Sequence, residues 1–260
     1  MAERSTAGQL WYQASRTGDD WIIRFPRLCE ATVEAGGRGV SIHPDPRADP
    51  DLVPVVLIGN IMAFLLAIRG HCVLHASAVE ARGQGVALVG SSGMGKSTVA
   101  ALLCSAGATL ITDDVLRVDL GNEPICLRGT AQLRLRPAAR QILGLFAKEP
   151  PTGETADSRV AVLPPRARRR VPLAAVVVPL PSRTDRQVVV QEISGAEALL
   201  LLARFPRIYG WREEVVLARN FRQLASLVRQ VPVFTARVPW GPPFRPDTSG
   251  ELLEQIARAV

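Results

Sequence analysis

Short apolar runs separated by turn-forming residues fill the first part of the chain. They lie at residues 10–12, 21–25, 31–33 and 40–42, and glycine, proline and aspartate punctuate them. Runs of this length between turn formers are typical of strands joined by hairpins. The pattern predicts a small antiparallel sheet. Because this sheet holds no catalytic constellation, its role is either structural or the docking of a partner.

A longer apolar run follows at residues 52–69 and stops at Gly70. It contains Pro54, Gly59 and Asn60, and it is shorter than the ~20 residues that a membrane-spanning helix needs. The run therefore predicts a buried helix and no contact with a membrane.

The clearest alternation of strand and helix patterns lies between residues 72 and 114. It predicts strands at residues 72–80 and 86–89, a helix at 96–105 and a strand at 109–111. A glycine-rich loop, Gly90–Thr98, thus connects a strand to a helix, and Asp113 and Asp114 follow the next strand.

The C-terminal part continues this alternation. Strands are predicted at residues 125–128, 132–135, 173–178, 188–190 and 233–238, and helices at 196–203, 216–228 and 252–259. Residues 147–171, rich in proline and arginine, predict a mobile segment whose apolar content is too low to anchor it. The chain predicts an α/β fold with a small β-rich region at residues 1–50 and a main domain at residues 51–260.

The composition is that of an ordinary globular protein, with 47% apolar and 21% charged residues among 260. The net charge of +7 comes mainly from arginine. It favours an acidic partner, such as nucleotide phosphates, an acidic protein or nucleic acid, unless it reflects composition alone. The run Arg166–Arg170 lacks interleaved aromatic residues, which favours a solvated loop over a nucleic-acid site.

The cysteines give information about the compartment. Cys29, Cys72, Cys104 and Cys126 are far apart and form no C-x-x-C pair. Their spacing predicts neither a disulfide framework nor a zinc site and fits a reducing cytoplasm. Residues 1–18 are polar and lack the apolar core of a signal peptide, which agrees with a cytoplasmic location.

The glycine-rich loop fits the pattern G-x-x-x-x-G-K-[ST] at every fixed position. Its residues are Gly90, Ser91, Ser92, Gly93, Met94, Gly95, Lys96, Ser97 and Thr98. In such a loop backbone N–H groups surround phosphates, and glycines keep side chains out of the way. Lys96 would neutralise the β- and γ-phosphates of a nucleotide, and Ser97 would bind Mg²⁺ at the positive end of the following helix. The motif predicts a phosphate-binding site.

Asp113 and Asp114 are the carboxylates that can complete this site, 17 and 18 residues after Lys96. The best apolar strand further downstream, residues 174–180, ends without a carboxylate. Adjacent residues at a strand end point to opposite sides, which indicates two roles. One carboxylate can bind Mg²⁺, and the other can take the proton of an attacking hydroxyl. A turn or helix cap is the structural alternative.

These residues together resemble the core of the HPr kinase/phosphorylase family and its kinase-like relatives. The resemblance is carried by Leu74–Val79, Gly83, Gly85, Gly90–Thr98, Gly107, Thr112–Val115 and, after the core, Leu133–Leu135 before Pro137. It implies a P-loop fold related to HPr kinase and phosphoenolpyruvate carboxykinase. It also implies that ATP and Mg²⁺ are used to phosphorylate a serine hydroxyl of a protein or peptide.

The resemblance also implies roles for single residues. Carried over by position, Asp113 is the catalytic base, Asp114 is a metal or water contact, and His75 orients or tunes that base, with Lys96 as a further catalytic residue. Without the resemblance, a histidine in an apolar strand would be a structural residue. Family members often assemble, so a homo-oligomer is part of what the resemblance implies.

The chain departs from the family at one motif. The bifunctional enzymes carry a glutamate in a glycine-rich motif after the aspartate pair, but Cys126–Thr130 has none, and Glu123 is the nearest acid. This departure argues against a phosphorylase activity and against HPr as the acceptor. Kinases that modify the C-terminal serine of lasso-peptide precursors are relatives that fit this size and core. Arg128, Arg134 and Arg136 either steady the phosphoryl group or form a solvated face.

The first hypothesis is therefore an ATP-dependent serine kinase that acts on a protein or peptide, including a ribosomally made precursor peptide. The alternatives are a nucleotide-binding regulatory module without transfer activity and a small-molecule kinase. The identity of the acceptor, the oligomeric state and the role of the N-terminal region do not follow from the sequence.

Overall fold

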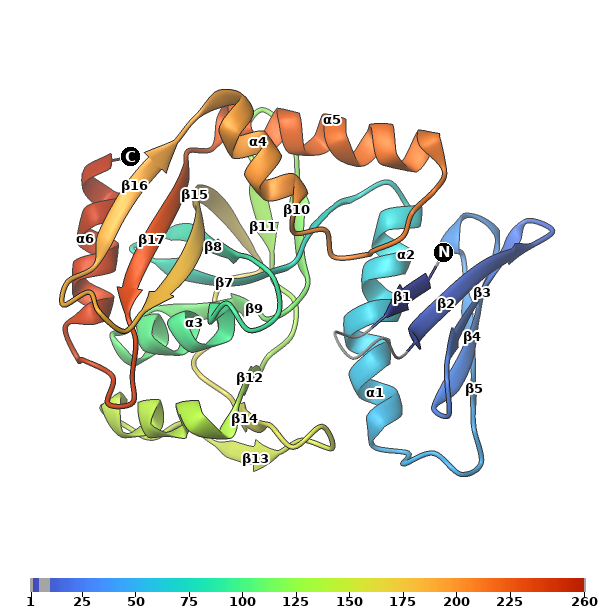
Figure 1. The fold of residues 1–260 in the computed structure, drawn as a ribbon, viewed down its shortest axis with the longest axis horizontal. Helices are drawn as coiled ribbons and strands as arrows, with labels where there is room; N and C mark the ends of the chain where they lie inside the picture. Colours follow the sequence, from blue (N-terminus) through green and yellow to red (C-terminus); the bar gives the residue numbers. More distant parts are fainter. Residues whose placement is uncertain (1, 5–9, 260) are drawn as a thin grey trace.

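The computed structural model describes residues 2–4 and 10–259 of the protein, and part of the polar stretch at residues 1–18 lies outside them. Within the described residues the fold is mixed α/β, with a smaller β-rich part at one end (Figure 1). The predicted α/β class is confirmed.

The N-terminal part is a five-stranded antiparallel sheet in which each strand pairs with the next in sequence. Its elements are β1 (Ala2–Arg4), β2 (Leu10–Thr17), β3 (Asp20–Phe25), β4 (Cys29–Val33), the 3₁₀ turn η1 (Ala35–Gly37) and β5 (Val40–Pro44). Alternate residues of β3 and β4 are buried, as expected of a sheet with one face on a core. The predicted small antiparallel sheet is confirmed.

One helical segment packs on this sheet. It consists of α1 (Leu52–Val56), the π-helical turn η2 (Leu57–Ile61) and α2 (Met62–Ile68). Phe64 of α2 stacks on Trp211 with ring centroids 5.1 Å apart, and Trp21 of β3 meets Phe64 edge-on at 5.3 Å. The predicted buried helix is confirmed. None of the described helices is long and apolar enough to cross a membrane.

The packing of this helix bears on how the chain divides. Its buried residues share one hydrophobic cluster with the N-terminal sheet and with Ile208 and Trp211, whereas the other clusters of described residues lie in the rest of the chain. The contacts therefore favour a division after residue 70. The division at residue 50 stays a prediction.

A nine-stranded mixed sheet forms the centre of the rest of the chain. Its order is β6-β10-β11-β15-β8-β7-β9, with β17 beside β15 and β16 beside β17. The strands are β6 (Cys72–Leu74), β7 (Ala76–Ala81), β8 (Gln84–Val89), β9 (Thr109–Thr112), β10 (Leu116–Asp119), β11 (Ile125–Leu127), β15 (Arg170–Ser182), β16 (Val189–Ile193) and β17 (Val233–Pro239). The parallel pairs among the described strands are β15 with β8 and β15 with β17.

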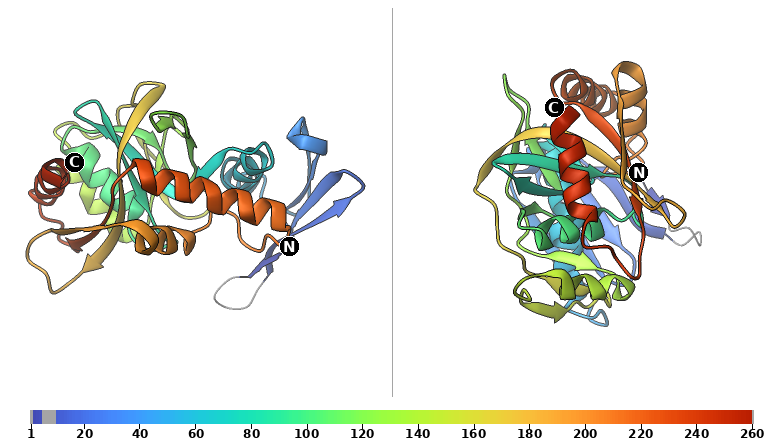
Figure 2. Two further views of the ribbon diagram at one scale, coloured as in Figure 1. Left: turned by 90° about the horizontal axis from the view of Figure 1, so that it is seen from above. Right: turned by 90° about the vertical axis from the view of Figure 1, so that its left-hand side faces the viewer.

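Helices cover both faces of this sheet (Figures 1 and 2). One face carries α3 (Lys96–Ser105), α6 (Thr248–Ala259) and the 3₁₀ helix η3 (Pro137–Leu145), and the other carries α4 (Gly195–Ala203) and α5 (Glu214–Gln230). Along β8, Val86 and Leu88 contact the first group, whereas Ala87 and Val89 contact the second, as the alternation of side chains in a strand requires. The predicted order of strand, loop and helix around residues 90–95 is confirmed.

A three-stranded sheet, β12 (Leu133–Leu135), β14 (Val160–Val162) and β13 (Thr152–Glu154), completes the fold. The expectation that residues 147–171 lack an apolar anchor is wrong. Val160 is 6% exposed and Val162 is fully buried, because β14 pairs with β12 and packs into the cluster around α3. Arg168 pairs with Glu80 of β7 and Arg170 pairs with Asp119 of β10, so acids of the central sheet match these two arginines.

Candidate active site

The glycine-rich loop joins β8 to α3 at the edge where the sheet meets the N-terminal part. Gly93 and Gly95 have φ of 91° and 84°, a left-handed backbone that favours glycine. A Cβ at Gly95 would also lie 2.3 Å from Cη2 of Trp240. Glycine is thus required here both by the backbone and by the indole that lies against it.

Lys96 is buried beneath the loop at the start of α3. Its Nζ donates hydrogen bonds to the carbonyl oxygens of Gly90 at 2.9 Å and Ser91 at 3.1 Å. Burial lowers the pKa of Lys96 to about 8, with the carboxylates of Asp114 and Asp113 opposing the shift. The ammonium group is therefore poorly solvated, and an anion held by the loop would find an unscreened positive charge.

Asp113 is held from three elements. Its Oδ1 accepts hydrogen bonds from Ser97 Oγ at 2.8 Å and Ser77 Oγ at 2.6 Å, and its Oδ2 accepts one from the backbone N–H of Arg134 at 3.0 Å. The contact with Ser97 links the carboxylate directly to the loop motif. Ser77 was not singled out by the sequence analysis.

Asp114 faces a different set of partners. Its Oδ2 accepts from Arg207 Nη2 at 2.8 Å and lies 3.9 Å from Arg134 Nη2, and its Oδ1 lies 3.2 Å from His75 Nε2. Burial raises the pKa of Asp114, but Arg207, His75 and Arg134 outweigh it and hold that pKa well below its usual range. The carboxylate is therefore ionised at neutral pH.

The backbone of Asp114 is itself unusual. Its φ of 71° lies in the left-handed region, where a non-glycine residue costs on the order of 1–3 kcal/mol. Such strain persists only where surrounding contacts determine the conformation. Here the contacts to Arg207 and His75 hold the carboxylate in its place.

His75 lies where the predicted strand at residues 72–80 breaks into β6 and β7. Burial lowers its pKa, so its imidazole is neutral at pH 7, although the hydrogen bond with Asp114 opposes the shift. Its Nδ1 is buried and has no hydrogen-bond partner among the described residues. A neutral imidazole with its Nε2–H toward Asp114 fixes that carboxylate without adding a charge.

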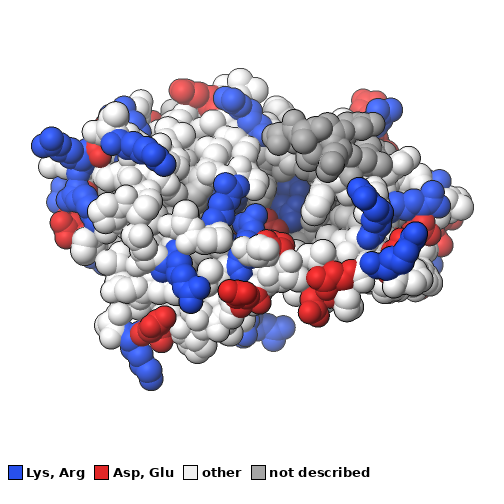
Figure 3. All heavy atoms as spheres, turned by 60° about the horizontal axis from the view of Figure 1, so that its bottom comes forward, with Lys and Arg blue, Asp and Glu red and all other residues white. Residues whose placement is uncertain are grey.

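A cavity of about 450 Å³ opens over these residues. Its basic lining residues are Lys96, Arg134, Arg136, Arg159, Arg183 and Arg207, against the two acids Asp113 and Asp114. Figure 3 shows basic and acidic side chains gathered at a hollow on one face of the molecule. This excess of positive charge suits a polyphosphate ligand.

Aromatic residues close one end of the same cavity. Trp240 and Phe244 contact each other edge-to-face with ring centroids 5.5 Å apart, and both line the cavity with Thr98 and Ala139. They come from the turn after β17. The cavity therefore joins a charged region over Lys96 to an aromatic region beside Trp240.

Most of the predicted site residues line this one cavity. They are His75, Ser92, Gly93, Gly95, Lys96, Ser97, Thr98, Asp113 and Asp114. The other loop residues, Gly90, Ser91 and Met94, do not line the cavity. Within the loop, Met94 Sδ accepts a hydrogen bond from the N–H of Ser91 at 3.1 Å. Arg134 and Arg136 reach the cavity, whereas Arg128 instead donates to the carbonyl of Ala167.

The pairing of these residues differs from the expectation. Ser97, predicted to share a metal with Asp114, contacts Asp113. His75, predicted beside Asp113, contacts Asp114. The residues that sequence reasoning missed are Trp11, Asn60, Ser77, Arg159, Arg183, Arg207, Tyr209, Trp240 and Phe244. Ser77 lies within Leu74–Val79, a stretch that carries the resemblance, but no role was assigned to it from the sequence, and the others stand in no recognisable motif.

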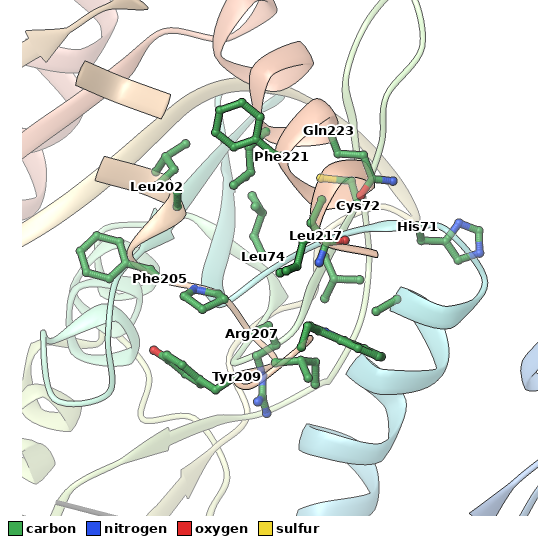
Figure 4. Close-up of a pocket in the computed structure, with 18 of the residues that line it drawn as sticks. His71, Cys72, Leu74, Leu202, Phe205, Arg207, Tyr209, Leu217, Phe221 and Gln223 are labelled. Carbon is green, nitrogen blue, oxygen red and sulfur yellow. The ribbon is translucent and has the colours of Figure 1, made fainter. Parts of the chain in front are cut away.

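A second, apolar cavity of about 530 Å³ lies beside the charged one, between β6, α4 and α5. Figure 4 shows Leu74, Leu217 and Phe221 around it, with Arg207 and Tyr209 at one side. Arg207 and Tyr209 line both cavities. Arg207, which pairs with Asp114, therefore lies next to the apolar residues of the second cavity.

Comparison with protein-family models gives no match. Comparison with curated proteins gives no match either. Among solved structures, the chain is similar to the Hpr(Ser) kinase/phosphatase from Coxiella burnetii, with 12% identity over 72% of this chain and 94% of that chain. The TM-score is 0.37, so the likeness is distant, and the residues of the site have to carry the functional argument.

Proposed function

We propose that the protein is an ATP-dependent kinase that transfers the γ-phosphoryl group to a serine hydroxyl of a protein or peptide. One observation carries the proposal. In a single basic cavity, the loop lysine Lys96 lies with two adjacent carboxylates, one bonded to Ser97 and the other to His75 and Arg207. The P-loop kinase core, the cytoplasmic location and a homo-oligomer stay predictions beside it.

The residues present fit ATP with Mg²⁺. Hydroxyl and carboxylate oxygens are the ligands that Mg²⁺ prefers, and Ser97 Oγ and Asp113 Oδ1 lie 2.8 Å apart. Lys96, Arg134 and Arg136 supply positive charge for the phosphates. When bound, Mg²⁺ would be held by Ser97 and Asp113 and would neutralise negative charge that develops on the phosphates.

The contacts favour an exchange of the roles that the sequence suggested for the two aspartates. Asp113, bonded to Ser97, is the better placed to hold the metal with it. Asp114, ionised and oriented by His75 and Arg207, is the better placed to accept the proton of the attacking hydroxyl. A carboxylate of low pKa can serve as the base in phosphoryl transfer. The transition state is largely dissociative, so little proton transfer to the base has occurred when it is reached.

Trp240 and Phe244 extend the proposal to the nucleoside. With the phosphates bound by the loop and Lys96, the base would extend toward Thr98 and the aromatic end of the cavity. Stacking on an aromatic side chain is worth about 1–3 kcal/mol per base and accepts any base. Trp240 is the residue we expect to stack with adenine.

Two substitutions test the assignment. Asp114→Asn should abolish phosphoryl transfer, seen as ADP formation with serine peptides or with water as acceptor, while ATP binding remains. Asp113→Asn should weaken the Mg²⁺-dependent part of ATP binding. If Asp114→Asn transfers phosphate at the wild-type rate, the role proposed for Asp114 is wrong.

The same assay separates the other functions. If the wild-type protein binds ATP tightly but neither hydrolyses it nor phosphorylates a peptide or a metabolite, the protein is a nucleotide-binding regulatory module rather than a kinase. If free hydroxyl metabolites are phosphorylated and peptides are not, the protein is a small-molecule kinase.

A further inference from the structure

Two more cavities meet the phosphate cavity at Asp114. The sheet-side cavity, about 700 Å³, lies between the N-terminal sheet and α1, and the strand-side cavity, about 270 Å³, lies between α1 and the sheet of β12 to β14. Asp114 and Arg134 are the residues that line all three. The proposed base therefore stands at a junction with two approaches that do not pass through the nucleotide.

The sheet-side cavity has an apolar wall. Phe25 and Leu28 come from the end of β3 and the turn after it, and Val56 comes from α1. Trp11, 49% exposed on β2, lines both this cavity and the phosphate cavity. An exposed tryptophan at the mouth of an apolar cavity next to a catalytic carboxylate is an anchor for an apolar side chain.

Its charged residues balance, with three arginines against three aspartates. They are Arg27 and Asp49 on the N-terminal side and Arg134, Asp157 and Arg159 on the core side, with Asp114 at the inner end. Arg134 and Arg159 both pair with Asp157, so most of this charge is already matched within the protein. The apolar surface, rather than a net charge, distinguishes this cavity from the phosphate cavity.

The strand-side cavity continues past Asp114 in another direction. The helix contributes Pro54, Val55 and Ile58, and Ile58 is 46% exposed. Arg134 of β12 and Glu154 of β13 contribute from the other side, and these are the two edge strands of their sheet. Edge strands offer backbone hydrogen-bonding groups to an extended chain, although on β12 the N–H of Arg134 is already bonded to Asp113.

We propose that the sheet-side and strand-side cavities together form the acceptor cleft. Resting on the proposed kinase function, the cleft takes an extended peptide that places a serine at Asp114 and an apolar or aromatic side chain of a nearby residue against Trp11 and Leu28. The two cavities share only Val55, Asp114 and Arg134 among their described residues. A single small metabolite needs one of them, whereas a chain that enters and leaves past the base needs both.

The proposal gives the N-terminal sheet a function. Without it the sheet-side cavity would lose the wall made by Trp11, Phe25 and Leu28. The sheet also contacts the connection that carries Arg207. Tyr12 donates a hydrogen bond to the carbonyl of Tyr209 at 2.8 Å, two residues beyond Arg207. One unit thus shapes the acceptor cleft and supports the residue that orients the base.

The test is a peptide library with a fixed central serine and randomised neighbours, incubated with γ-labelled ATP and the full chain. The wild-type protein should select a large apolar residue at one position within three residues of the serine. Leu28→Gln and Trp11→Ala should each lower kcat/KM for the selected peptide by about tenfold and flatten that preference, since they remove apolar contact from the cleft. Leu200→Ala, an exposed apolar residue of α4 outside all three cavities, should change neither.

Each other outcome is decisive. Peptides phosphorylated with a preference that both cleft variants leave intact would overturn the acceptor cleft and leave the kinase standing. Slow ATP hydrolysis that depends on Asp114, with no peptide phosphorylated, would also overturn it. A wild-type protein that neither binds nor hydrolyses ATP would instead overturn the proposed function. Circular dichroism of each variant separates loss of contact from loss of fold.

Discussion

Replacing Gly95 by alanine tests the arrangement of the loop against Trp240. Two costs add in this variant. The first is the left-handed backbone at φ 84°, which costs a side chain about 1–2 kcal/mol. The second is the contact of 2.3 Å between the new Cβ and Cη2 of Trp240, and overpacking of this kind costs about 1–3 kcal/mol. The expected loss in the free energy of unfolding is therefore about 2–5 kcal/mol.

Trp240→Ala separates the two costs. In that background the new methyl group meets no indole, so Gly95→Ala should cost only the backbone part, about 1–2 kcal/mol. Urea unfolding of the four proteins gives the coupling free energy of the cycle. We expect a coupling of about 1–3 kcal/mol, and a value within about 0.5 kcal/mol of zero would show that the indole does not lie on the loop.

The same tryptophan variant has a second readout in ligand binding. Trp240→Ala should weaken ATP binding by about tenfold or more, because it removes the stacking surface for the base. Binding of inorganic tripolyphosphate, which has no base, should change little. Equal losses for both ligands would mean that Trp240 supports the loop rather than the nucleoside.

Three further predictions follow from single contacts. In the free protein the pKa of Lys96 is lowered to about 8, and bound phosphates should raise it because they favour the protonated form. ATP affinity should therefore be full below about pH 8 and fall about tenfold between pH 7 and 9, as measured by titration calorimetry. The matched variant Lys96→Met should lose this dependence, and an equal slope in both would contradict it. Gly59→Ala should lower kcat with little change in ATP affinity, because its Cβ would lie 3.0 Å from Arg207 Nη2 and 3.2 Å from Asp114 Oδ2. Ser77→Ala should weaken Mg²⁺-dependent ATP binding several-fold while Ser105→Ala, whose hydroxyl donates to the carbonyl of Leu102 in its own helix, does not.

The site was predictable to the extent that local sequence determines it. The loop Gly90–Thr98 has one backbone path because Gly93 and Gly95 require it, and β8 and α3 follow from apolar periodicity. Asp113 and Asp114 follow a short buried strand, so their position near the loop could be expected. Their individual partners could not, because the left-handed turn at Asp114 is set by tertiary contacts.

The remainder of the site comes from residues distant in sequence. Arg207 and Trp240 reach the cavity from connections after α4 and β17, and neither connection carries a motif. Trp11 reaches it only because the N-terminal sheet packs on α2. The prediction that residues 147–171 lack an anchor failed for a related reason. Val160 and Val162 pair with β12, which lies over twenty residues earlier in the chain.

The number of residues in the helical segment formed by α1, the π turn Leu57–Ile61 and α2 is as important as their identity. A π turn holds one more residue than an α turn, so it can lose one residue and still leave the two halves facing as they do, whereas removing one residue from α1 or α2 would rotate one half of the helix by about 100° against the other. Val53 and Val56, before or at the turn, and Phe64, after it, would then no longer face the same sheet. Gly59 would also leave Asp114 and Arg207. The helix fixes how the N-terminal sheet lies relative to the base, and we expect it to tolerate many substitutions but no change in residue count outside the π turn.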